Sequence, residues 1–316
     1  MFESKPEPGG MLRYGIPAYR LPRDIIKTEY QRVFDMGVDF KPNTKIGKDI
    51  TLEQLKNDYD AIFNGIGAQV GWTLGLDGET GQSNVYTGVE FLIKHNLEEK
   101  LNVGDNVVIV GGGDTAMDCA RSCLRMGAKV TVIYRRSRNE MPAIEADIVG
   151  AEEEGVNFQF LSTPTKIMAD GGKVTGVECI KMELGEKDES GRASFSPIKG
   201  SEFQIDVTCL IPAISQEPDW EGLDELKNEK GWSTVINETG RMEEGGKIWA
   251  GGDISRRLGL VTEAVGDGKK AADEIDCFLK GEEYKTLEQK PLILAEAMNL
   301  NHYSELARQS IGEGDA

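Results

Sequence analysis

The stretch Val107-Val108-Ile109-Val110-Gly111-Gly112-Gly113-Asp114-Thr115-Ala116 decides how this chain folds. Its β-branched run predicts a buried strand, and glycines spaced as G-x-G-x-x-A predict a turn into a helix over residues 115–126. The first glycine permits the tight turn, the second lets backbone approach a pyrophosphate, and the small third residue lets helix pack on strand. The pyrophosphate then faces helix N–H groups and the positive end of the helix dipole. We therefore predict a Rossmann-type dinucleotide-binding unit. The less favoured alternative is a glycine turn that binds no ligand.

A second apolar strand, predicted over residues 129–134, ends in two cations, Arg135 and Arg136. At this position NAD sites place an Asp or Glu on the ribose 2′-hydroxyl, whereas an Arg accommodates a 2′-phosphate. Guanidinium matches phosphate because its N–H groups donate two parallel hydrogen bonds. The pair therefore favours NADPH over NADH, and the alternative is a solvated strand end.

Length and charge restrict the partners. The chain has 316 residues, enough for two domains, with a formal net charge of -18 and a pI of about 4.7. An acidic surface disfavours nucleic acid and anionic membranes, because both are bound through basic patches. The sequence shows no apolar run long enough to span a bilayer and no secretory signal. We expect a cytoplasmic protein without membrane insertion.

The cysteines show no pattern of a redox or metal centre. They are Cys119, Cys123, Cys179, Cys209 and Cys277, with no C-x-x-C and no spacing suited to an iron–sulfur cluster. Cys119 and Cys123 stand one helical turn apart behind the glycine loop. They could form a redox pair or half a metal site, but packing of small residues against a sheet is favoured. We expect no metal on this chain.

Patterns elsewhere predict further elements. Strand 247–252 would end at Asp253 and place a carboxylate at the sheet edge, where it can accept hydrogen bonds from a polyol. A helix from Val261 or Thr262 to residue 279 would aim its N-terminus at electron-rich ligand atoms. Gly171-Gly172 predicts a hairpin turn, and the polar stretch 185–200 is expected to be a mobile loop. We also predict helices at 23–36, 52–57, 89–96 and 145–154, and strands at 38–41, 59–68, 156–161, 166–168, 173–183 and 206–214.

Four stretches together resemble a known family: residues 3–22, the glycine loop through residue 118, residues 134–143 and residues 250–272. The chain resembles the glutamate synthase small-subunit family, which includes the flavin half of dihydropyrimidine dehydrogenase and the large subunit of ferredoxin:NADP transhydrogenase. The resemblance runs in order from residue 2 to about residue 280. It implies an α/β fold of two nested Rossmann-like domains, of the pyridine nucleotide-disulfide reductase type. The discontinuous FAD domain would comprise 1–100 and 216–280, the inserted NADPH domain 101–215, and a C-terminal extension 281–316.

The resemblance also implies a flavoprotein oxidoreductase that uses FAD and NADPH. Hydride would pass from NADPH to flavin, without a side-chain acid or base, and electrons would leave singly to an iron–sulfur subunit or domain on another chain. Glu3 would bind the FAD ribose, Gly10, Met11 and Arg20 the flavin, and Ile46 the adenine end. The second FAD segment would be Gly252, Asp253, Val261 and Thr262. The NADPH site would comprise Gly111, Gly112, Gly113, Asp114, Thr115, Arg135, Arg136, Ala213 and Ile214.

Three departures from the family pattern affect the flavin half. The family's first strand, its own G-x-G-x-x-G and the following helix do not precede Glu3 here, and its N-terminal cluster-binding domain is also absent. Ser215 stands where the family usually has glycine. Another chain would then supply the FAD pyrophosphate loop, or the sequence is truncated, or FAD binding is weak. The last case gives the alternative function, an NADPH-binding regulatory or structural subunit with a degenerate flavin site.

Overall fold

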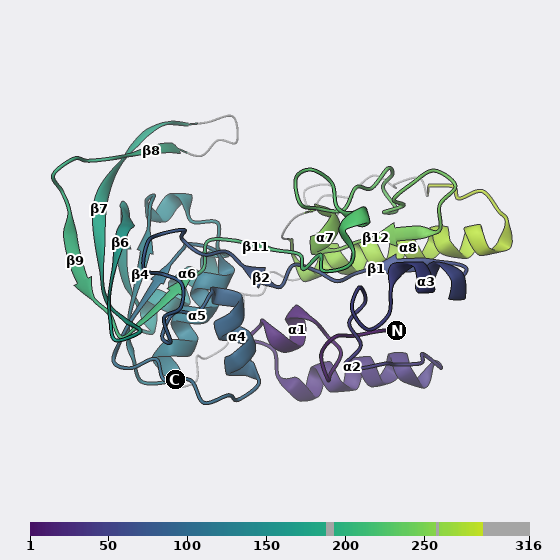
Figure 1. Cartoon of the computed structure of the whole chain (residues 1–316), viewed down its shortest axis with the longest axis horizontal. Coiled ribbons are helices and arrows are strands. Elements are labelled where there is room, and N and C mark those ends of the chain that lie inside the picture. Colours follow the sequence, from purple (N-terminus) through teal and green to yellow (C-terminus); the bar gives the residue numbers. More distant parts are fainter. Residues whose placement is uncertain (188–192, 257–258, 287–316) are drawn as a thin grey trace, which may run out of the picture.

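The computed structural model describes residues 1–187, 193–256 and 259–286. It is an α/β structure with two lobes (Figure 1), which confirms the predicted fold class. The large-sheet lobe contains a parallel sheet in the order β10-β3-β4-β5, and the small-sheet lobe contains the parallel pair β1-β12. The antiparallel pair β2-β11 lies between them in the view of Figure 1. Its strands are β2 (Val70–Gly71) and β11 (Gln216–Glu217).

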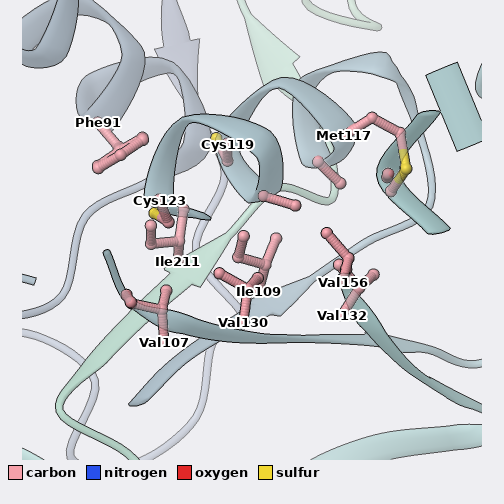
Figure 2. Packing of buried hydrophobic residues seen from close by; sticks show 14 of the residues in the cluster. Phe91, Val107, Ile109, Met117, Cys119, Cys123, Val130, Val132, Val156 and Ile211 are labelled. Atoms are coloured by element: carbon pink, nitrogen blue, oxygen red, sulfur yellow. The ribbon is translucent and has the colours of Figure 1, made fainter. Parts of the chain in front are cut away.

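The large-sheet lobe forms around the predicted strand, turn and helix. Alternate residues of β3 face opposite sides, so Val107 and Ile109 pack under helices while Val108 and Val110 pack against an antiparallel sheet. Figure 2 shows the helical side, where Met117, Cys119 and Cys123 of α5 cover the strands. The elements are α4 (Gly88–Asn96), β3 (Asn106–Val110), α5 (Asp114–Arg125), β4 (Lys129–Tyr134), η1 (Arg138–Glu140), α6 (Glu145–Glu153), β5 (Asn157–Phe160) and β10 (Cys209–Pro212).

Helix α4 packs in this lobe, because Phe91 and Leu92 belong to the same cluster of buried residues as β3 and α5. The sequence-based domain boundary put residues 89–96 with the FAD portion. Helix α4 in fact contacts both lobes, since Asn96 Nδ2 also donates to the Tyr14 carbonyl at the end of α1 at 2.9 Å. The predicted strand 206–214 shortens to β10, which pairs in parallel with β3 over Cys209–Pro212.

An antiparallel sheet covers the second face of the large sheet. The Gly171-Gly172 turn joins β6 and β7, with Asp170 opposite Lys173, as predicted. The expectation of a mobile loop over 185–200 is wrong for the described part, because β8 pairs with β7 and sets Phe195 opposite Leu184. Residues 188–192 lie outside the described residues. The strands are β6 (Ser162–Asp170), β7 (Lys173–Lys187), β8 (Ala193–Pro197) and β9 (Phe203–Asp206).

The small-sheet lobe has less regular strands than predicted. Strand 59–68 reduces to β1, and strand 38–41 reduces to a bridge between Lys41 and Phe2. Gly67 has φ +67°, a left-handed conformation that follows the end of β1. Residues 287–316 of the expected extension lie outside the described residues. The lobe contains α1 (Met11–Tyr14), α2 (Arg23–Asp35), α3 (Leu52–Asp58), β1 (Ile62–Asn64), η2 (Asp224–Leu226), β12 (Ile248–Ala250), α7 (Asp253–Arg256) and α8 (Val261–Lys280).

Candidate functional site

A single cleft of about 1930 Å³ extends across both lobes. All of the binding residues proposed from the sequence line it, although they come from widely separated segments. The large-sheet lobe contributes the glycine loop, the end of β4 and Ala213, and the small-sheet lobe contributes Glu3, Gly10 and the start of α8. The structure brings these residues together, and their contacts with a cofactor stay predictions.

The glycine loop leaves backbone open to the cleft. Gly111 has φ +146°, and a Cβ there would lie 2.2 Å from the carbonyl oxygen of Ala213. A Cβ on Gly112 would lie 2.7 Å from the ring of Tyr134. Gly113 is the N-cap of α5 and provides no side-chain cap, so the first turn of this helix can donate N–H groups to an anion. The loop therefore fits a dinucleotide pyrophosphate.

The side chain of Asp114 has a structural partner. Its Oδ1 accepts a hydrogen bond from the backbone N–H of Ile144 at 2.8 Å. This bond ties the segment after β4 to the start of α5. Thr115 follows in the first turn, and its methyl group lies where a Cβ on Gly88 would approach to 2.9 Å. The close contact explains why a glycine begins α4 at this point.

The two arginines at the end of β4 differ in exposure. Arg135 is exposed, whereas Arg136 is 8% exposed and donates a hydrogen bond from Nε to the Ala193 carbonyl at 2.8 Å. Both guanidinium carbons lie over the ring of Phe195, at 4.5 Å for Arg135 and 4.8 Å for Arg136. Sequence reasoning missed Phe195 because it lies within the polar stretch expected to be a loop.

The small-sheet lobe contributes a different set of polar groups. The Glu3 carboxylate accepts a hydrogen bond from Lys5 N–H at 2.8 Å, and Thr44 N–H donates to the Glu3 carbonyl. This pairing holds the first residues beside the segment that contains Ile46. Gly10 has φ +50° and forms the N-cap of α1, directly before Met11. The Glu3 carboxylate and the backbone at Gly10, Met11 and Ile46 thus lie along the cleft, where they can contact different parts of an extended ligand.

The second segment of this lobe lies around α7 and α8. Gly252 has φ +72° and donates its N–H to Asp267 Oδ2 at 3.1 Å. Asp253 Oδ1 accepts from Gly259 N–H at 3.0 Å, and burial raises the pKa of this carboxyl group. Helix α8 begins at Val261, followed by Thr262, and both residues line the cleft. The arrangement presents a carboxylate beside a helix N-terminus.

Arg20 joins the two lobes. Its Nη1 lies 2.6 Å from Asp118 Oδ1 on α5, and its Nη2 lies 2.8 Å from Asp147 Oδ2 on α6. We call these three residues the Arg20 clamp. Burial raises the pKa of Asp118 to about 6, although the Arg20 charge and hydrogen bond lower it. Sequence reasoning missed the clamp, because the paired residues are 98 and 127 positions apart.

The cysteine prediction is confirmed for the pair behind the glycine loop. Cys119 and Cys123 are both buried in the helical core of the large-sheet lobe. Cys119 Sγ donates to the Gly88 carbonyl at 3.5 Å, and burial raises the pKa of both thiols. Throughout the described ranges, no group of three or more His, Cys, Asp or Glu residues is arranged to hold a metal ion. No helix within these ranges combines the length and apolar character needed to cross a membrane.

Comparisons with known proteins give a consistent picture. Residues 10–268 match the pyridine nucleotide-disulphide oxidoreductase family. The NADP(+)-dependent formate dehydrogenase subunit beta of Moorella thermoacetica is 42% identical over 284 residues, covering 89% of this chain and 40% of that protein. The small chain of the Escherichia coli NADPH glutamate synthase is 36% identical over 300 residues, covering 89% and 63%. The latter match confirms the resemblance drawn from the sequence motifs.

Solved structures share the fold. FprA of Mycobacterium tuberculosis in complex with NADPH superimposes with a TM-score of 0.73 at 18% identity, covering 91% of this chain and 80% of that one. A thioredoxin reductase from Lactococcus lactis gives a TM-score of 0.65 at 21% identity, covering 89% and 90%. This chain therefore has the two-lobed α/β fold of these enzymes. It spans less than two thirds of the length of the sequence relatives described above.

Proposed function

Since this chain belongs to the pyridine nucleotide-disulphide oxidoreductase family, we propose that it is the NADPH-oxidising, FAD-dependent part of a flavoprotein oxidoreductase. One observation carries the proposal. The glycine loop at α5 and the arginines at the end of β4 face the same cleft as Glu3 and Asp253. A phosphate-binding turn, two cations and polar groups for a second ligand thus share one space.

On the large-sheet side, the backbone of Gly111 to Thr115 would hold the NADPH pyrophosphate. The open helix N-terminus offers N–H donors, and a side chain at Gly111 or Gly112 would collide with its neighbours. Arg135 and Arg136 would bind the 2′-phosphate, since guanidinium pairs with phosphate oxygens. Ala213 and Ile214 follow β10 at the same edge and would bound the site.

On the small-sheet side, Glu3 would accept hydrogen bonds from the FAD ribose, with Ile46 at the adenine end. Gly10, Met11 and Arg20 would lie at the flavin, with Gly252, Asp253, Val261 and Thr262 on the second segment. FAD bound here would accept hydride from NADPH and release the electrons one at a time. The protein then has to hold the two cofactors in contact and exclude water, which requires no acid or base from the chain.

The relatives provide the basis for a partner proposal. The name of one of them describes the beta subunit of an NADP(+)-dependent formate dehydrogenase. We infer that electrons pass to an iron–sulfur subunit or domain. We also infer that the assembly works in the cytoplasm. The FAD portion would comprise 1–100 and 216–280, with 101–215 as the NADPH portion and 281–316 as an extension.

The test is purification with co-eluting partners, followed by an absorption spectrum and anaerobic titration. A flavin band that NADPH bleaches faster than NADH supports the proposal. A chain that binds NADPH tightly but takes up no FAD, even together with its co-purified partner, supports the alternative of a regulatory or structural subunit. A chain without preference for NADPH contradicts the assignment of Arg135 and Arg136.

A further inference from the structure

Phe195 places one aromatic ring against both cations at the end of β4. Its ring centroid lies 4.5 Å from the Arg135 guanidinium carbon and 4.8 Å from that of Arg136. Phe195 is on β8, about sixty residues along the chain, and β8 is held by pairing with β7 at Leu184. The arginines are thus oriented by a separate hairpin.

The same strand also fixes Arg136 by a second contact. The Ala193 carbonyl accepts the Nε–H of Arg136 at 2.8 Å, and Ala193 is buried. An arginine has five N–H donors in a fixed plane, so a carbonyl on Nε and a ring on the face determine where the remaining donors point. Both Arg135 and Arg136 line the cleft, so their orientation sets the donors that a ligand meets.

Two guanidinium groups over one ring repel each other. The negative face of the ring attracts each cation and offsets part of this repulsion. A phosphate dianion that contacts both cations would attract them further and accept charge-assisted hydrogen bonds. The ring therefore holds two cations close together, where the 2′-phosphate on the ribose of NADPH would bind.

We propose that Phe195 is a positioning residue that determines the preference for a 2′-phosphorylated nicotinamide dinucleotide. Together with the Ala193 carbonyl, it holds Arg135 and Arg136 in the orientation that binds the 2′-phosphate. The inference deepens the proposed function, because it rests on NADPH binding at the end of β4. Phe195 lies outside the described clusters of buried side chains, so the loss of its ring does not hollow the core.

The experiment measures binding of 2′,5′-ADP and 5′-AMP to the full chain by calorimetry, for wild type, Phe195→Leu, Phe195→Tyr and Ile198→Ala. Ile198 is a matched control, since it follows β8 and is 40% exposed. We expect Phe195→Leu to weaken 2′,5′-ADP about tenfold and to change 5′-AMP by less than about twofold. Phe195→Tyr keeps the ring and should bind 2′,5′-ADP as tightly as wild type. Ile198→Ala should leave the affinities for both ligands unchanged.

Two results would overturn the inference. One is an unchanged affinity of Phe195→Leu for 2′,5′-ADP, and the other is an equal loss of affinity for both ligands, which indicates general damage. Should Phe195→Leu fail to fold, Phe195→Met replaces it, because it also removes the ring but keeps apolar volume. A wild-type chain that binds both ligands equally contradicts the proposed function itself, whereas a preference that survives loss of the ring contradicts the role of Phe195 alone.

Discussion

Arg20→Leu tests how the two lobes are held together. Arg20 binds Asp118 and Asp147 at 2.6 Å and 2.8 Å, and the side chains of these carboxylates are 8% and 11% exposed. Leucine would leave both carboxylates poorly solvated. Asp147 keeps Arg121, whose Nη1 lies 3.3 Å from its Oδ1. We therefore expect the loss of Arg20 to destabilise the environment of Asp118 most. The Arg20 charge and hydrogen bond lower the pKa of Asp118 in wild type, so without them this pKa should rise further above about 6.

The expected magnitude follows from burial. Removal of one partner from a buried ion pair costs about 3–5 kcal/mol, because the remaining charge stays buried. The Arg20 side chain is 27% exposed, so we expect a value near the lower end, about 3 kcal/mol. Arg138→Leu is the matched control, since Arg138 also binds two carboxylates, Glu145 and Glu152, but these are 67% and 36% exposed. Its loss should cost much less than the loss of Arg20, because solvent screens exposed ion pairs.

Urea denaturation followed by circular dichroism measures both costs. A double-mutant cycle of Arg20→Leu with Asp118→Asn should give a coupling energy of at least about 1 kcal/mol. Hydrogen exchange should increase where α1 meets α4, although Asn96 Nδ2 still donates to the Tyr14 and Gly15 carbonyls there. The reasoning is refuted if Arg20→Leu costs no more than Arg138→Leu and the cycle shows no coupling.

Three further predictions concern pH, the glycine loop and the arginines. The pKa of Asp118 in the folded state is about 6, which is above the ordinary value of 3.8. The stability that its protonation contributes is therefore complete below about pH 4 and is lost as the pH rises through about 6. Relative to Asp118→Asn, the unfolding free energy of wild type should fall by about 2–3 kcal/mol between pH 4 and 7. Gly111→Ala should weaken NADPH binding at least about tenfold in fluorescence titrations, while Gly127→Ala, at φ +90° with open space around it, should leave binding unchanged although it is strained. Arg135→Leu with Arg136→Leu should reduce the NADPH-to-NADH affinity ratio about tenfold or more and leave NADH binding intact, and an unchanged ratio would contradict the site.

The sequence predicts the large-sheet lobe better than the rest, for a physical reason. A buried run, a glycine turn and an amphipathic helix are local patterns, and β4 and α5 occur where these patterns place them, to within one residue. The binding residues of the small-sheet lobe could be predicted only from the family resemblance, because no local sequence pattern connects Glu3, Ile46 and Asp253. The cleft that gathers them is a consequence of tertiary packing.

What the sequence missed depends on pairing over long distances. The register that sets Phe195 opposite Leu184 pairs the end of β7 with β8, a strand of only five residues with the sequence ASFSP. So short a strand carries too few apolar positions to fix its partner and register from the sequence. The partners of Arg20 lie on two helices of the other lobe, so charge alone could not identify them among many carboxylates. Both features become visible when the strands and helices are in place.

Helix α5 links the two parts of the site. Its N-terminus opens to the cleft at Gly113, and one turn later Asp118 receives Arg20 from the other lobe. A rigid helix transmits displacement along its axis, so a shift of Asp118 also moves the N–H groups at the cleft. The geometry of a ligand bound at the glycine loop therefore depends on the Arg20 clamp. Because α5 also packs on β3 through Met117 and Cys119, the phosphate-binding end and the lobe contact are parts of one buried unit.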